Sequence, residues 1–232
     1  MKNILKKLFR STIDVFVGED QMSPEQSFRF LVRRLAGDYG RGSGPTTFVV
    51  TPTEAAGEVG GETLMLTSLL QDEIGARVLL IDADFAAEES LSDRFGYGGE
   101  PGLAQMLAGE HTSARFVLRE TKREKVAILP RGTDPDQVDR ASLKERLTSV
   151  LSSVSADFDF VVIAQCAVTV DTRGLEMVEQ SDCVLLFARE GTSRLERIED
   201  QEAALMQNGE VDVRIVLLLP EPMFASHEDE SD

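Results

Sequence analysis

The sequence is poor in cysteine and in basic residues, and it contains no apolar run of the length that a membrane span requires. Its two cysteines, Cys166 and Cys183, are too few for a disulfide framework and fit a reducing cytosol. Only 24 Lys and Arg residues stand against 41 Asp and Glu residues, which leaves a net charge of −17. A chain this acidic repels phosphate backbones, so the composition predicts no nucleic-acid partner.

The residues that are present suffice for one domain of ordinary size. Of the 232 residues, 42% are hydrophobic and 28% are charged, so the chain can bury a sizeable core and is no disordered acidic polymer. No signal-peptide pattern opens the sequence. We therefore expect a cytoplasmic globular protein.

Strand-like and helix-like segments alternate along most of the chain. Short apolar runs rich in β-branched residues predict strands at 47–51, 77–81, 126–129, 158–163, 183–188 and 214–219. Helical patterns lie near 62–74, 102–108, 139–154, 173–180 and 193–207. This alternation is typical of an α/β fold with a doubly wound, mostly parallel sheet flanked by helices. Ligands of such folds bind at the carboxyl ends of the strands, so the loops after Thr51, Asp82 and Ile163 are the places to look for a site.

The two ends of the chain differ in charge from its middle. We expect a basic amphipathic segment over residues 1–20, one α/β domain over 23–220 and an acidic, disordered tail over 221–232. Apolar residues at helical spacing predict a helix within 1–16. Candidate contacts with a membrane or a partner are Lys2, Leu5, Lys6, Lys7, Leu8, Phe9 and Arg10. Three alternatives stay open for this segment: an anionic membrane at the inner face of the cell, a partner protein, or its own domain.

A further helix is predicted over 24–36. Ser23 and Gln26 have the spacing of a capping box, Pro24 suits the first turn, and Gly37 is expected to end the helix.

The loop after the first predicted strand has the placement of a phosphate-binding loop. Residues 51–64, TPTEAAGEVGGETL, run from a strand through glycines into a helix, where backbone N–H groups and the helix dipole converge on an anion. A working loop also needs a lysine and a hydroxyl, G-x-x-x-x-G-K-[ST]. Here no Lys or Arg occurs between Arg41 and Arg77, and the loop carries Glu54, Glu58 and Glu62. Taken alone, this segment is better interpreted as a glycine-rich turn.

Motifs further along the chain place that loop in a family. They are Ile81-Asp82-Ala83-Asp84, Phe95-Gly96, Glu100-Pro101-Gly102-Leu103, Leu107, Gly109 and Leu129-Pro130 with Gly132. In this order and spacing they resemble the bacterial tyrosine kinase (BY-kinase) domain of exopolysaccharide systems, a member of the MinD/ParA-like branch of P-loop ATPases. The resemblance covers residues 23–220 and implies the fold of that branch.

The same resemblance places altered residues at the nucleotide site. The family's G-E-G-K-S-T falls on 57–62, with Gly57 at its start, Gly60 at the phosphate-binding lysine and Gly61 at the Mg²⁺-binding hydroxyl. The Walker B aspartate becomes Ala164. Only Asp82 and Asp84 remain, either to handle Mg²⁺ or, as we favour with the loop altered, to hold a loop by hydrogen bonds. The resemblance thus implies a vestigial nucleotide site made of Gly57, Gly60, Gly61, Asp82 and Asp84.

The resemblance therefore implies a pseudokinase: a regulatory or scaffold subunit of an exopolysaccharide machinery, with no catalytic residue and no metal. No cofactor is expected, with weak binding of ATP or ADP and Mg²⁺ as the alternative. Its expected partner is a membrane polysaccharide co-polymerase or a kinase paralogue. Two rival functions stay open, an atypical ATPase or autokinase completed in trans by another subunit, and a MinD/ParA-like spatial regulator at a membrane.

Two smaller expectations complete the sequence analysis. The helix at 24–36 corresponds to the family's oligomer-forming segment, E-x-x-R-x-x-R, for which Gln26, Arg29 and Arg33 are the candidate residues, so a homo-oligomer is a further option. Cys166, at the Walker B loop, has no basic neighbour in sequence and is expected to be a small buried filler and no nucleophile.

Overall fold

The computed structural model describes residues 16–17, 23–40, 44–54, 57–110, 113–134, 136, 138, 140–154, 156–207 and 211–219. The strands are β1 (Phe16–Val17), β2 (Thr46–Pro52), β3 (Val78–Asp82), β4 (Arg119–Glu120), β5 (Val126–Leu129), β6 (Phe160–Ala164), β7 (Cys183–Arg189) and β8 (Val213–Leu218). The α-helices are α2 (Pro24–Tyr39), α3 (Gly60–Ile74), α4 (Leu91–Arg94), α5 (Leu103–Ala108), α6 (Leu143–Val154), α7 (Gly174–Glu179) and α8 (Leu195–Met206). Short 3₁₀ turns are η1 (Ala114–Phe116) and η3 (Arg140–Ser142).

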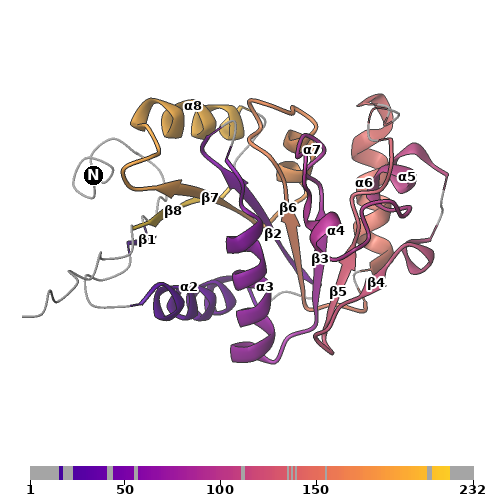
Figure 1. Ribbon diagram of the computed structural model, residues 1–232, viewed down its shortest axis with the longest axis horizontal. Coiled ribbons are helices and arrows are strands. Elements are labelled where there is room, and N and C mark those ends of the chain that lie inside the picture. Colours follow the sequence, from indigo (N-terminus) through magenta and orange to yellow (C-terminus); the bar gives the residue numbers. More distant parts are fainter. Residues whose placement is uncertain are drawn as a thin grey trace, which may run out of the picture.

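The strands form one eight-stranded sheet in the order β1-β8-β7-β2-β6-β3-β5-β4 (Figure 1). Every pairing is parallel except that of the edge strand β4 with β5. In the centre, Val49 of β2 lies opposite Ile163 of β6, which in turn lies opposite Ile81 of β3. These β-branched runs suit a pleated sheet that is buried on both faces. The predicted α/β fold with a mostly parallel sheet is confirmed.

Helices cover both faces of the sheet. One apolar cluster joins α2 and α3 to residues such as Phe48, Leu80 and Val162, which point to one side of their strands. The other joins α5, α6, α7 and α8 to the alternating residues, among them Leu79 and Ile163. Within the described part of the chain, no helix has the length and apolar character needed to span a bilayer.

Helix α2 begins as predicted and ends later than predicted. Ser23 and Gln26 form the capping box, with the Gln26 N–H 3.2 Å from the Ser23 hydroxyl oxygen. The helix passes Gly37 and reaches Tyr39, so the expected end at Gly37 is wrong by two residues. Tyr39 explains the extension, because its ring packs edge-on against Phe48 of β2, with 5.7 Å between ring centroids.

The amino-terminal expectation is corrected at its last residue. Phe16, counted within a helical pattern, belongs to β1, where it and Val17 pair with Val216 and Leu217 of β8. Helical periodicity in the sequence does not reveal that a sheet edge is available, and pairing with that edge satisfies the backbone of these two residues. Residues 1–15 and 220–232, with the seven candidate contact residues and the acidic tail, lie outside the described residues.

Two of the family-like motifs are in direct contact. The Leu103 N–H donates to the Pro130 carbonyl oxygen at 2.7 Å, and the Ala104 N–H donates to that of Arg131 at 2.9 Å. A β-carbon built on Gly102 would lie 2.0 Å from the Pro130 carbonyl oxygen, so only glycine fits there. The E-P-G-L and L-P-x-G segments are therefore a single packing unit beside β5.

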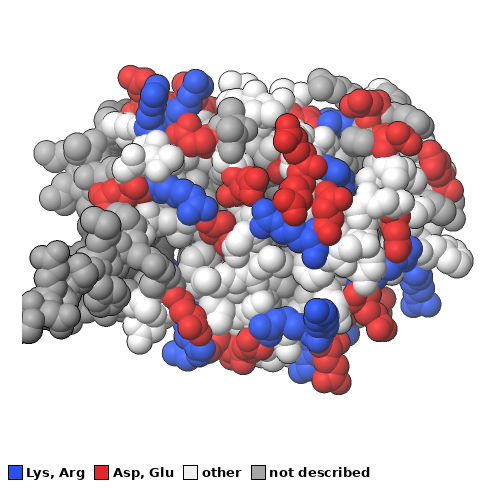
Figure 2. Space-filling view, in the orientation of Figure 1, with Lys and Arg blue, Asp and Glu red and all other residues white. Residues whose placement is uncertain are grey.

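Charged side chains are mixed on the face shown in Figure 2. Acidic groups lie beside small groups of basic side chains there, and the described part of this face carries no extended basic patch. Among the described residues, opposite charges form ion pairs, such as that of Arg123 with Asp72 at 2.8 Å. The arrangement agrees with the expectation that nucleic acid is not a partner, which stays a prediction.

Candidate functional site

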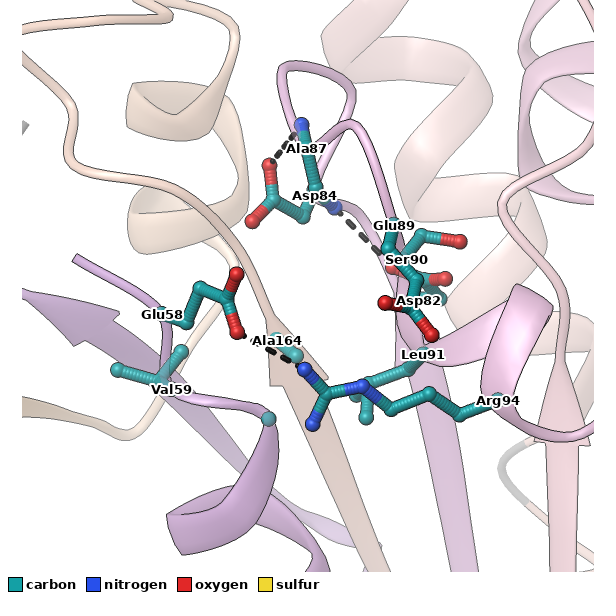
Figure 3. Close-up of a pocket in the computed structure, with 11 residues that line it drawn as sticks. Glu58, Val59, Asp82, Asp84, Ala87, Glu89, Ser90, Leu91, Arg94 and Ala164 are labelled. Carbon is teal, nitrogen blue, oxygen red and sulfur yellow. Dashed lines mark hydrogen bonds and ion pairs between the residues drawn. The ribbon is translucent and has the colours of Figure 1, made fainter. Parts of the chain in front are cut away.

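A small cavity lies at the carboxyl ends of β3 and β6, in front of the amino end of α3 (Figure 3). It is lined by Glu58, Val59, Gly60, Asp82, Asp84, Ala87, Glu89, Ser90, Leu91, Arg94 and Ala164. Of the expected vestigial site, Gly60, Asp82 and Asp84 are thus brought together with Ala164. Gly57 and Gly61 lie in the adjoining loop and first helical turn and are not among the lining residues.

The loop and α3 have the backbone plan of a phosphate-binding loop. Helix α3 begins at Gly60, and its N-cap residue, Val59, offers no side-chain hydrogen bond to the first turn. A β-carbon on Gly60 would lie 2.9 Å from Nη1 of Arg94, whereas one on Gly61 would have no heavy atom within 4 Å. The space in front of Gly60 is therefore taken by the Arg94 guanidinium, which comes from α4.

The three acids of the loop are all engaged within the chain. Glu54 accepts a hydrogen bond from the Arg194 N–H at 3.2 Å, and Glu58 pairs with Arg94 at 2.8 Å. Glu62, whose side chain is only 10% exposed, forms an ion pair with Arg189 at the end of β7.

Asp82 is an anchor for the chain that follows it. The residue is fully buried, and its Oδ2 accepts from the Ser92 N–H at 2.7 Å and from the Ser92 hydroxyl at 2.5 Å. The Ser92 hydroxyl oxygen accepts in turn from the Arg131 N–H at 2.7 Å. The second oxygen of Asp82 accepts from the Asp84 N–H at 3.3 Å. This carboxylate is therefore used by the protein itself, as in the loop-holding alternative.

Asp84 is half-buried at the rim of the cavity. Its Oδ1 accepts from the N–H groups of Ala86 and Ala87 at 3.2 and 2.9 Å. Burial raises the pKa of this carboxyl, and the nearby Asp82 adds to the increase, while the two backbone N–H groups oppose it. The side chain thus shapes the turn after β3.

Two arginines that the sequence analysis missed hold this turn from outside. Arg131 donates to the carbonyl oxygens of Asp84 and Ala87 at 3.3 and 2.7 Å. The Arg173 guanidinium lies 4.7 Å from the centroid of the Phe85 ring and pairs with Asp171 at 2.7 Å. Arg131 lies inside the L-P-x-G motif, so that motif could have pointed to it. Likewise, Arg94 of the cavity directly precedes the Phe95-Gly96 motif.

Cys166 is buried, as the sequence analysis expects, and Cys183 is buried as well. Both cysteines are free. Burial raises the pKa of each thiol to about 12. Cys166 is therefore a filler.

The candidate oligomer residues have partners within their own chain. Gln26 belongs to the capping box of α2. Arg29 and Arg33 both bind the carboxylate of Glu73 in α3, the latter at 2.6 Å, and Arg33 lowers the pKa of that carboxyl. As placed, these side chains fasten α2 to α3.

The lining residues do not fit a magnesium–nucleotide. Such a ligand needs cations for its phosphates and carboxylates free to hold the metal. The lining includes the carboxylates of Glu58, Asp82, Asp84 and Glu89 but a single guanidinium, Arg94, which already pairs with Glu58. Within the described ranges, no three His, Cys, Asp or Glu side chains converge as metal ligands would.

Comparison with known proteins relates this chain to bacterial tyrosine kinases. No family model matches it. It is 28% identical over 154 residues to the tyrosine-protein kinase ptk of Acinetobacter johnsonii, which corresponds to 65% of this chain and 20% of that relative. The chain thus spans about one fifth of the length of this curated relative.

Solved structures agree with the sequence relation at the level of the fold. The kinase domain of the Escherichia coli tyrosine kinase ETK superposes with a TM-score of 0.70 at 19% identity, covering 93% of this chain and 84% of that one. The BceF tyrosine kinase domain gives a TM-score of 0.61 at 21% identity, with coverages of 84% and 75%. The chain has the P-loop ATPase fold in the form found in BY-kinase domains.

Proposed function

We propose that this chain is a catalytically inactive BY-kinase-like domain, a pseudokinase. It serves as a regulatory or scaffold subunit of an exopolysaccharide synthesis and export machinery. It acts by protein–protein contact with a membrane polysaccharide co-polymerase or with an active kinase, and it transfers no phosphate. The relation to a tyrosine-protein kinase in sequence, and to kinase domains in fold, supports this setting.

The observation that carries the proposal is the chemistry of the cavity. Gly60 and Ala164 both line it, and they are the positions at which the resemblance expects the lysine and the metal-binding carboxylate that phosphoryl transfer requires. A charge-assisted hydrogen bond contributes about 1.5–3 kcal/mol, so loss of the lysine alone weakens a phosphate ligand by one to two orders of magnitude. The remaining acid at the strand end, Asp82, is committed to Ser92.

A second candidate function is an atypical ATPase or autokinase, and one observation favours it. The Arg94 guanidinium lies in front of Gly60, so a cation is present beside the loop without a contribution from another subunit. However, this guanidinium already forms an ion pair with Glu58, so a phosphate would have to displace that carboxylate in order to bind it.

Titration calorimetry and phosphate-release assays with Mg²⁺-ATP separate the two candidates. The pseudokinase is expected to bind no nucleotide at submillimolar concentration and to release no phosphate above background. A variant that carries Gly60→Lys, Gly61→Thr and Ala164→Asp together tests whether the assay detects a restored site. Turnover by the unmodified chain, or label transfer to Tyr39 or Tyr97, would overturn the proposal.

The scaffold role is tested by the proteins that the full chain retains in cells. Cross-linking, purification and mass spectrometry are expected to recover a polysaccharide co-polymerase or a tyrosine kinase. A chain without residues 1–16 shows whether the basic segment is needed, and fluorescent fusions of both chains report membrane placement. Recovery of neither partner class by either chain would remove the scaffold role.

A further inference from the structure

One ion pair crosses the mouth of the cavity. Nη2 of Arg94, at the end of α4, lies 2.8 Å from Oε2 of Glu58, in the loop before α3. Figure 3 shows the two side chains extended toward each other from opposite sides, in front of Ala164. Both are partly exposed, at 35% for Arg94 and 67% for Glu58. The pair thus joins the loop before α3 to the end of α4.

The location of the guanidinium explains why it needs a partner. Nη1 of Arg94 is 2.9 Å from the position of a β-carbon on Gly60, the first residue of α3. The amino end of a helix carries a partial positive charge, so a cation beside it is unfavourable unless an anion lies with it. The Glu58 carboxylate supplies that anion from the adjoining loop.

We propose that the Glu58–Arg94 pair is an internal closure of the phosphate-loop cavity. Glu58 takes the role of the anion that Arg94 and the amino end of α3 would otherwise attract. The chain therefore balances the charge of the loop by itself, and external phosphate is excluded by competition with a tethered carboxylate. The inference rests on the proposed function, because it treats the cavity as the counterpart of a nucleotide site.

Removal of the tethered carboxylate tests the closure by a gain of binding. Inorganic pyrophosphate, without Mg²⁺, is titrated calorimetrically at low ionic strength into the full chain and into its Glu58→Gln variant. We expect the variant to bind about fivefold more tightly, because the exposed ion pair that pyrophosphate must displace is worth at most about 1 kcal/mol. In the double variant Glu58→Gln/Arg94→Gln, the gain is expected to disappear. An exposed ion pair contributes little stability, so both variants are expected to fold.

Glu54→Gln is the matched control, because it removes the same charge from the same loop without touching Arg94. It is expected to change pyrophosphate affinity by less than about threefold, as a screened surface charge does. Equal affinity of the unmodified chain and Glu58→Gln, or a gain that persists in the double variant, would overturn the closure. Neither result affects the proposed function, which fails only if the unmodified chain turns over ATP or retains no partner.

Discussion

Asp82 and Ser92 are joined by two hydrogen bonds to one carboxylate oxygen, from the Ser92 N–H at 2.7 Å and from its hydroxyl at 2.5 Å. Both residues are fully buried. The carboxyl end of β3 is thereby joined to α4. The Ser92 hydroxyl oxygen, which accepts from the Arg131 N–H, extends this connection to Arg131. A carboxylate with this set of donors contributes to the fold whether or not a ligand is bound.

Ser92→Ala is expected to destabilise the protein by about 2–3 kcal/mol, because it leaves buried partners of a charged group unsatisfied. Urea denaturation at neutral pH measures the loss. Ser149→Ala, at an exposed position of α6, is the control and is expected to change stability by less than about 0.5 kcal/mol. Equal effects of the two substitutions would show that Asp82 does not depend on Ser92.

The stability of the Asp84→Asn variant, relative to that of the unmodified chain, is expected to increase as the pH rises. Burial raises the folded-state pKa of Asp84 above its ordinary value of 3.8. The contribution of this carboxyl to the stability of the unmodified chain is therefore fully present below pH 3.8 and is lost as the pH rises through the folded pKa. Asparagine does not titrate, and its oxygen can accept from the same Ala86 and Ala87 N–H groups. Denaturation between about pH 4 and 8 should show the stability of the variant, relative to the unmodified chain, increasing.

For Asp93→Asn, in the same segment, the expected change of stability with pH has the opposite sign. The Ser90 N–H, at 2.8 Å, lowers the pKa of Asp93, so its contribution is present above the ordinary value and is lost as pH falls. This variant should therefore lose stability relative to the unmodified chain as the pH rises through the acid range, up to about pH 5, with no further trend above it. Parallel trends for the two variants would contradict the assigned shifts.

Cys166 and Cys183 are expected to resist thiol reagents in the folded protein. Burial raises each pKa to about 12, which at pH 8 leaves only about one thiolate in 10⁴. Ellman's reagent should react with neither thiol in the native chain and with both in urea. Rapid reaction of one thiol in the native chain would indicate an accessible cysteine at Cys166 or Cys183.

Substitution by alanine is expected to have opposite effects on stability at Gly61, in the first turn of α3, and at Gly75, the residue that follows the helix. Gly61→Ala enters open space in the first turn and should stabilise the protein by about 0.5 kcal/mol, because glycine loses more backbone entropy in a helix. Gly75 caps the same helix at φ +73, so Gly75→Ala should cost about 1 kcal/mol. Urea midpoints of the two variants measure both effects, and stabilisation by Gly75→Ala would refute the cap.

The sheet was predictable because each central strand is a short apolar run bounded by turn residues. Residues 47–51 and 183–188, for example, fall inside β2 and β7. The capping box of α2 was also readable, since Ser23 and Gln26 act within one turn. What local pattern did not reveal were the two-residue edge strands β1 and β4, which pair with the edges that β8 and β5 offer.

The site was predictable in its backbone and less so in its charges. The glycines and strand-end acids were located from motif spacing, and three of the five line the cavity. The arginine partners were not found, because Glu62 and Arg189 are 127 positions apart and Glu58 and Arg94 are 36 apart. A single sequence shows net charge but not which charges the fold brings together, so acids that looked repulsive are in fact paired.

The contact between Gly102 and Pro130 has a consequence for how such chains diverge. A side chain at 102 would collide with a carbonyl oxygen of another strand's loop, so the two segments can change only together. Gly60 carries no comparable steric demand from the backbone, because a β-carbon there would approach only the side chains of Arg94 and Leu91. Residues that line the cavity can therefore change while the contact between Gly102 and Pro130 stays fixed, so this contact reports the fold independently of any activity.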